Sequence, residues 1–90
     1  MIEIAGKKYE VIENNKSGFD ETALKERYSD ILKKYDYIVG DWGYEQLRLK
    51  GFYHNHNPKA TYDTKISVLD DYLYEYCNFG CAYFVIKRKD

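Results

Sequence analysis

The stretch YIVGDWGYEQLRLK, residues 37–50, decides the fold of this 90-residue chain. It opens with a short run of β-forming residues, passes two glycines, and continues with Leu47 and Leu49 alternating with polar residues. Two extended runs joined by a tight, glycine-bearing bend are typical of a β-hairpin. Because successive side chains of a strand point to opposite faces, the two leucines are expected in the core and Arg48 and Lys50 together on the other face.

Further strand patterns flank this hairpin. Residues 2–11 alternate around Gly6 and predict a first hairpin, and residues 60–66 alternate weakly and predict a short strand. Residues 81–86, CAYFVI, are apolar on both faces, which is typical of a central strand.

The first predicted helix covers residues 20–35. Asp20 is a good N-cap, with Phe19 before it and Leu24 four residues after it in the arrangement of a hydrophobic staple. A single apolar stripe then follows the helical period, made of Leu24, Tyr28, Ile31, Leu32 and Tyr35. The pattern predicts that this stripe packs on the sheet.

A second helix is predicted to begin at Ser67 as N-cap and to end near Asn78 or Gly80. Two aspartates occupy its first turn, where the helix dipole favours negative charge. Its apolar positions are Leu69, Tyr72, Leu73 and Tyr76. We expect Leu73 and Tyr76 to face the sheet, as Tyr28, Ile31 and Leu32 do from the first helix.

The predicted order of elements is β-β-α-β-β-β-α-β. Strand groups separated by single helices indicate an α+β fold, with a largely antiparallel sheet of about five to six strands and two helices packed on one face. A chain of 90 residues is expected to form a single domain over residues 1–90.

Composition limits the classes of function. The net charge of −1 argues against a strongly basic nucleic-acid-binding domain. No apolar run approaches the ~20 residues that span a bilayer, and no signal peptide is evident, so a cytoplasmic protein without membrane partners is predicted. Cytoplasmic thiols are kept reduced, and Cys77 and Cys81 are therefore expected to be free.

Two stretches resemble a known family. YDYIVGDWGYEQLRLKGF, residues 35–52, and DYLYEYCNFGCAYFV, residues 71–85, are similar to the signatures of the YutD-like family, uncharacterised small proteins of Gram-positive bacteria. The likeness extends over residues 2–87. It implies a bacterial, cytoplasmic, single-domain protein and supplies no catalytic residues. His54 and His56 lie in the least family-like stretch.

Metal and catalytic chemistry are poorly represented. Cys77 and Cys81 could join His54 and His56 in a zinc site, but the single residue between the two histidines does not match the usual ligand spacing. Neither thiol is marked as an activated nucleophile. Turn carboxylates such as Asp41, Glu45 and Asp63 are more often solvated or bonded to the local backbone. We expect no metal, no cofactor and no catalytic residue, and an enzyme is the third alternative.

A candidate nucleic-acid site follows from cations interleaved with aromatic residues. Such a pattern on a sheet is used by binders of single-stranded RNA, in which rings stack on bases and cations hold phosphates. The alternative is an ordinary solubilising sheet face. The candidate residues are Arg48, Lys50, Phe52, Tyr53, Lys87 and Arg88.

Trp42 and Tyr44 form a second candidate surface. Trp42 between two glycines either plugs one end of the core or anchors a partner, because Trp and Tyr dominate interface energies. The leading interpretation is a non-catalytic binding or regulatory module, associated with RNA or a ribonucleoprotein. The alternative is a protein–protein adaptor or homodimer that uses this aromatic surface.

Overall fold

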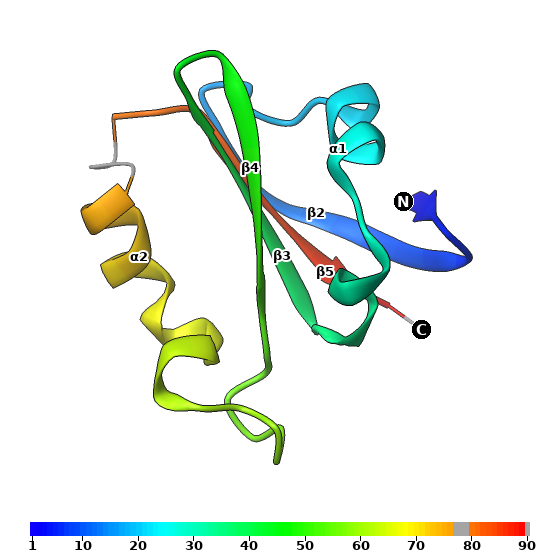
Figure 1. Ribbon diagram of the computed structural model, residues 1–90, viewed down its shortest axis with the longest axis vertical. Coiled ribbons are helices and arrows are strands. Elements are labelled where there is room, and N and C mark those ends of the chain that lie inside the picture. The colour runs from blue at the N-terminus through cyan, green and yellow to red at the C-terminus, as the bar shows by residue number, and fades with distance from the viewer. Residues whose placement is uncertain (77–79, 90) are drawn as a thin grey trace.

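The computed structural model describes residues 1–76 and 80–89 and contains one five-stranded antiparallel sheet in the order β1-β2-β5-β3-β4 (Figure 1). The α+β class and the antiparallel sheet predicted from the sequence are confirmed. The strands are β1 (Ile2–Ile4), β2 (Lys7–Asn15), β3 (Tyr37–Gly43), β4 (Gln46–Phe52) and β5 (Tyr83–Arg88). The helices are α1 (Glu21–Arg27) and α2 (Leu69–Tyr76), with 3₁₀ turns η1 (Asp30–Lys34), η2 (Tyr62–Thr64) and η3 (Ile66–Val68).

Both predicted hairpins are present, but the second turns at a different place. Gly43 pairs with Gln46, so the two-residue turn is Tyr44-Glu45, and both residues have positive φ, 53° and 65°. Gly40 lies instead within β3, where an added Cβ would come 2.3 Å from the Phe84 ring. That glycine makes room for a core aromatic ring rather than for a bend.

The two helices lie on opposite faces of the sheet, so the prediction that both pack on one face is wrong. Even-numbered residues of β3 and β5, such as Ile38 and Phe84, share a core cluster with Leu24 of α1. Odd-numbered residues, such as Val39 and Val85, share the other cluster with Leu73 of α2. Figure 1 shows α1 and α2 flanking the sheet. β5 is a central strand apolar on both faces, as predicted, and each face requires its own cover.

The predicted helix over residues 20–35 is shorter and interrupted. Asp20 is the N-cap, and its side chain accepts a hydrogen bond from the Ala23 N–H at 3.1 Å. α1 then ends at Arg27, because Tyr28 is extended and its hydroxyl bonds to the Tyr9 hydroxyl at 2.8 Å. Ile31, predicted in the core, is 71% exposed.

Residues 60–66 do not form the predicted strand. Thr61 and Thr64 form a reciprocal capping box around η2, and only Lys65 makes a bridge, to Tyr53. η3 precedes α2, so the predicted N-cap at Ser67 is also wrong. Leu73 is buried as expected, but Tyr76 is 54% exposed and does not face the core. The predicted helix end at Asn78 lies outside the described residues.

The expectation of free thiols is also corrected. Cys81 is disulfide-bonded, whereas Cys77 lies outside the described residues. The expectation was drawn from the reducing conditions of the cytoplasm. The spacing of two cysteines in the sequence does not determine whether their sulfur atoms come close enough to bond. In the described part of the chain, no helix is long and apolar enough to cross a membrane.

Candidate functional site

A fully buried carboxylate lies on the α2 face of the sheet. Asp41 of β3 is 0% exposed and is directly opposite Arg48 of β4. The Arg48 guanidinium donates to the carboxylate and forms an ion pair with it, and the Tyr72 hydroxyl donates to its other oxygen at 2.9 Å. A buried charge without partners would be strongly destabilising, so these two donors are what allow Asp41 to remain there.

Contacts of Arg48 and Tyr72 also hold α2 against the sheet. Arg48 also donates to the main-chain carbonyl of Tyr76 at 3.1 Å, and the Tyr72 ring meets the Phe52 ring edge-on at a centroid distance of 5.8 Å. Burial and then the charge of Asp41 raise the pKa of the Tyr72 phenol well above its ordinary value. Tyr72 therefore stays protonated and keeps donating to Asp41 throughout the physiological range.

A groove lies beside the contacts that Asp41 makes with Arg48 and Tyr72. Its volume is about 490 Å³, within the usual range of roughly 300–1,000 Å³ for ligand sites. The lining combines tyrosines and carboxylates from α2 and the 3₁₀ turns with one lysine from β4. These residues are Lys50, Tyr62, Asp63, Val68, Asp71, Tyr72, Glu75 and Tyr76.

The groove presents aromatic rings to solvent. Tyr62 is 76% exposed and Tyr76 is 54% exposed. The Tyr72 and Tyr76 rings lie 4.9 Å apart between centroids. The ammonium of Lys50 lies over the rings of Phe52 and Tyr72, at 5.3 and 6.0 Å from their centroids. Accessible rings of this kind are common anchors of protein interfaces.

Four of the six candidate nucleic-acid residues share the α2 face. Their strand register places Arg48, Lys50 and Phe52 on alternate positions of β4 and brings Lys87 of β5 opposite Tyr37 of β3. Phe52, however, is fully buried, and the Lys87 ammonium lies 5.9 Å from the centroid of the Tyr37 ring. Three of the four candidate cations, Arg48, Lys50 and Lys87, therefore share this face, while Phe52 belongs to the core and has no face open for stacking on a base.

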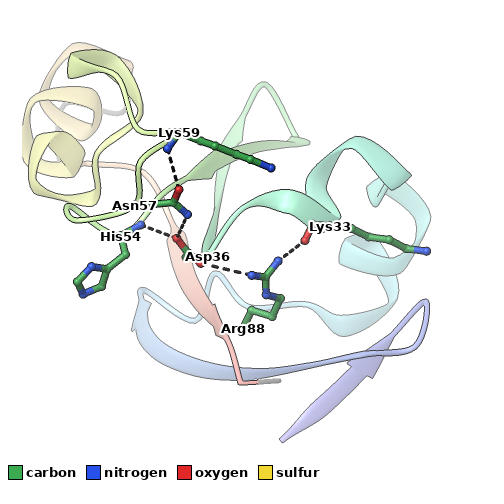
Figure 2. A network of polar contacts seen from close by, with 6 residues as sticks. All are labelled: Lys33, Asp36, His54, Asn57, Lys59 and Arg88. Atoms are coloured by element: carbon green, nitrogen blue, oxygen red, sulfur yellow. Dashed lines mark hydrogen bonds and ion pairs between the residues drawn. The ribbon is translucent and has the colours of Figure 1, made fainter.

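Tyr53 and Arg88, the other two candidates, lie elsewhere. Tyr53 is 6% exposed, and its ring lies 4.7 Å from that of Tyr35 between centroids. Arg88 belongs to a network around Asp36, just before β3 (Figure 2). Arg88 donates to the Lys33 carbonyl and pairs with Asp36. Both residues therefore make contacts within the folded chain: Tyr53 packs against Tyr35, and Arg88 binds Asp36 and the Lys33 carbonyl.

The network around Asp36 ties three distant segments together. The carboxylate accepts from the His54 main-chain N–H at 2.7 Å and from the Asn57 side chain at 3.1 Å (Figure 2). Asn57 in turn accepts from the Lys59 N–H. Partial burial acts to raise the pKa of Asp36, but these hydrogen bonds and the Arg88 charge together hold it below its ordinary value.

Asp36→Asn is expected to lower the free energy of unfolding at pH 7 by about 1.5–3 kcal/mol, because hydrogen bonds to a charged group are lost. The folded-state pKa is lowered, so this contribution is present above about pH 4 and disappears as the pH falls through the folded-state value. Urea unfolding at pH 7, 5 and 3 should show the gap between wild type and variant closing toward pH 3. Asp30→Asn, at an 89% exposed side chain, is the control and should change stability by less than about 0.5 kcal/mol. A gap that stays constant down to pH 3 would contradict this assignment.

Trp42 and Tyr44 lie in different environments. The Trp42 indole N–H donates to the Gly18 carbonyl at 2.7 Å, and its ring packs against the α1 core cluster. Tyr44 is fully exposed at the tip of the β3–β4 turn. Trp42 is thus partly buried against the core cluster on the α1 face, whereas Tyr44 faces solvent at the turn.

The residues considered for metal binding or catalysis are dispersed. Among residues 1–76 and 80–89, no group of three His, Cys, Asp or Glu side chains is placed to hold a metal ion. His54 and His56 are exposed, with ring centroids 5.5 Å apart. Asp41 is held by Arg48 and Tyr72, and Asp63 lines the groove.

The groove does not follow from the apolar pattern of the sequence. The signal was present as two i,i+4 pairs along α2, Asp71–Glu75 and Tyr72–Tyr76, which place carboxylates and rings in parallel rows. The groove was not predicted because the tyrosines of α2 were assigned only to the core.

Comparison with known proteins shows which protein family the chain resembles. Residues 3–87 match a family model described as "Putative antitoxin YutD-like". The protein "Putative antitoxin YutD" of Bacillus subtilis strain 168 is 68% identical over 88 residues, covering 98% of this chain and 97% of the relative. The solution NMR structure of yutD from B. subtilis has a TM-score of 0.83 at 67% identity and covers 99% of this chain and 81% of that one. A family match over nearly the whole sequence agrees with the resemblance found in residues 35–52 and 71–85, and the chain belongs to the YutD-like family.

Proposed function

We propose that this chain is a non-catalytic binding module whose partner is a protein, and that the partner docks at the groove between α2 and η2. The observation that carries the proposal is the pair of exposed tyrosines, Tyr62 and Tyr76, lining a groove of about 490 Å³. The B. subtilis relative is named "Putative antitoxin YutD", and this name supports a protein partner. A cytoplasmic setting stays a prediction from the sequence.

Association with RNA is the competing hypothesis, and the contacts on the α2 face favour it less. Arg48 is paired with Asp41, and the Phe52 ring that should stack on a base is buried. Three carboxylates, from Asp63, Asp71 and Glu75, line the groove where Lys50 lies. A phosphate backbone would be repelled there, since nucleic-acid affinity depends on neutralising phosphates with cations.

The proposal is tested by capture from a cell extract of the encoding organism, with and without nuclease. Three baits are compared: wild type, the groove variant Tyr62→Ala/Tyr76→Ala, and Tyr44→Ala, a control at a fully exposed tyrosine outside the groove. We expect one stoichiometric protein that survives nuclease, is retained by Tyr44→Ala and is lost by the groove variant.

Other outcomes contradict the proposal in distinct ways. Loss of the captured material after nuclease would favour RNA as the partner. Retention by the groove variant together with loss by Tyr44→Ala would place the interface at the β3–β4 turn instead.

A further inference from the structure

The groove has a charge as well as a shape. Its lining contains three carboxylates and one ammonium, a formal balance of −2. All three carboxylate residues, Asp63, Asp71 and Glu75, are exposed. Cations are attracted both by carboxylates and by the faces of tyrosine rings, so both kinds of lining residue select the same chemistry.

The lining residues of α2 are arranged in two rows. Asp71 and Glu75 are one helical turn apart, and so are Tyr72 and Tyr76 next to them. One turn of helix advances about 5.4 Å, and side chains on the same side of an extended peptide are spaced about 6.6–6.8 Å apart. Two long basic side chains separated by one residue can therefore each reach one carboxylate of α2 in successive turns, and the exposed rings of Tyr76 and Tyr62 line the same groove.

Arginine fits this arrangement better than lysine. A planar guanidinium stacks on an aromatic ring and donates two parallel hydrogen bonds to a carboxylate, whereas an ammonium is a strongly hydrated point charge. Tyr62 supplies a further exposed ring from η2, beside Asp63. The positive charge of Lys50 weakens the attraction of the groove for cations but does not reverse it, because the Lys50 ammonium lies over the rings of Phe52 and Tyr72.

We propose that the groove binds an extended segment of the protein partner in which two arginines are separated by one residue. This inference rests on the proposed function and adds to it the chemistry of the docking segment. The segment lies along α2, with its guanidinium groups paired with Asp71 and Glu75 and stacked on the rings of Tyr76 and Tyr62.

The test uses defined peptides instead of an unknown partner. The probe is an eight-residue peptide that alternates arginine with serine, and it is titrated into the ¹⁵N-labelled full chain by NMR at 25 and 200 mM salt. Matched peptides replace every arginine with citrulline, which keeps the shape but removes the charge, or with lysine. A single-stranded RNA octamer is titrated in parallel.

We expect the arginine peptide to shift the signals of α2 and η2, to bind more weakly at 200 mM salt, and to bind more tightly than the lysine peptide. The citrulline peptide should not bind measurably. Asp71→Asn/Glu75→Gln should weaken binding about fivefold or more, and Tyr62→Ala/Tyr76→Ala about tenfold. Lys50→Gln should strengthen it slightly, and Tyr44→Ala should leave it unchanged.

Several results would overturn the inference: equal binding of the citrulline peptide, unchanged binding by the Asp71→Asn/Glu75→Gln variant, or preferential binding of the RNA octamer. If the arginine peptide does not bind while the groove variant still loses its partner in the capture experiment, the protein-binding function stands and only the chemistry of the segment is wrong.

Discussion

Leu73→Ala is expected to lower the free energy of unfolding by about 2–5 kcal/mol, the range observed for truncation of buried leucines. The Leu73 side chain is 1% exposed and belongs to the core cluster that includes Val39, Phe52 and Val85. It is the buried residue of α2, so its removal leaves a cavity directly beneath the helix that forms the groove. Urea unfolding followed by far-UV circular dichroism measures the effect.

Ile31→Ala is the matched control for this prediction. Ile31 lies on the apolar stripe of the sequence but is 71% exposed in the structure. We expect its truncation to change stability by less than about 0.5 kcal/mol. A loss from Ile31→Ala as large as that from Leu73→Ala would contradict the interrupted α1–η1 segment and support one continuous helix instead.

Arg48→Ala is expected to cost about 3 kcal/mol, the lower end of the range for removing one partner of a buried ion pair. Asp41 is fully buried, and the loss of Arg48 would leave its carboxylate with the Tyr72 hydroxyl alone among the contacts described above. The lower end applies because the Arg48 side chain is 48% exposed, which lets water reach the vacated position. The tie from Arg48 to the Tyr76 carbonyl would also be lost, so hydrogen exchange of the α2 amides should accelerate.

A double-variant cycle separates the buried charge from lost packing. Asp41→Asn removes the charge but keeps an oxygen that accepts from Tyr72. In the Asp41→Asn background, Arg48→Ala should cost clearly less than in wild type, with a coupling of about 1–3 kcal/mol. Equal costs in the two backgrounds would mean that Arg48 stabilises the fold by packing and not by neutralising Asp41.

The fold was predictable where local patterns act without competition. The alternation in residues 2–11 and 37–50 indicated both hairpins, and the two-sided apolar run of residues 81–86 indicated the central strand. The cap at Asp20 was also identified, because capping depends only on neighbouring residues.

Long-range packing explains what the sequence did not reveal. A strand that is apolar on both faces requires two covering layers, so the helices separate to opposite sides of β5. The helical stripe of residues 20–35 is broken at Tyr28, whose backbone is extended, whose ring packs on the α1 core cluster and whose hydroxyl bonds to that of Tyr9, 19 residues away. A tertiary contact of this kind overrides local helix propensity.

The candidate site was predictable only in part, for the same reason. Alternation placed Arg48 and Lys50 on one face correctly, but it did not reveal that Asp41 lies directly opposite Arg48. It also did not reveal that Phe52 is covered by α2, through its contact with Tyr72. The groove depends on how α2 and η2 lie relative to each other, which no local pattern specifies.

Site-specific photocrosslinking in living cells tests most directly whether the groove beside α2 binds a protein. A photoreactive phenylalanine derivative replaces Tyr62 or Tyr76 in the groove, or Tyr44 at the β3–β4 turn as the control; all three positions are exposed. The account predicts that Tyr62 and Tyr76 give a discrete adduct of increased mass that protease removes and nuclease does not, while Tyr44 gives none. An adduct that nuclease removes, or a protein adduct at Tyr44 with none at Tyr62 and Tyr76, would contradict it.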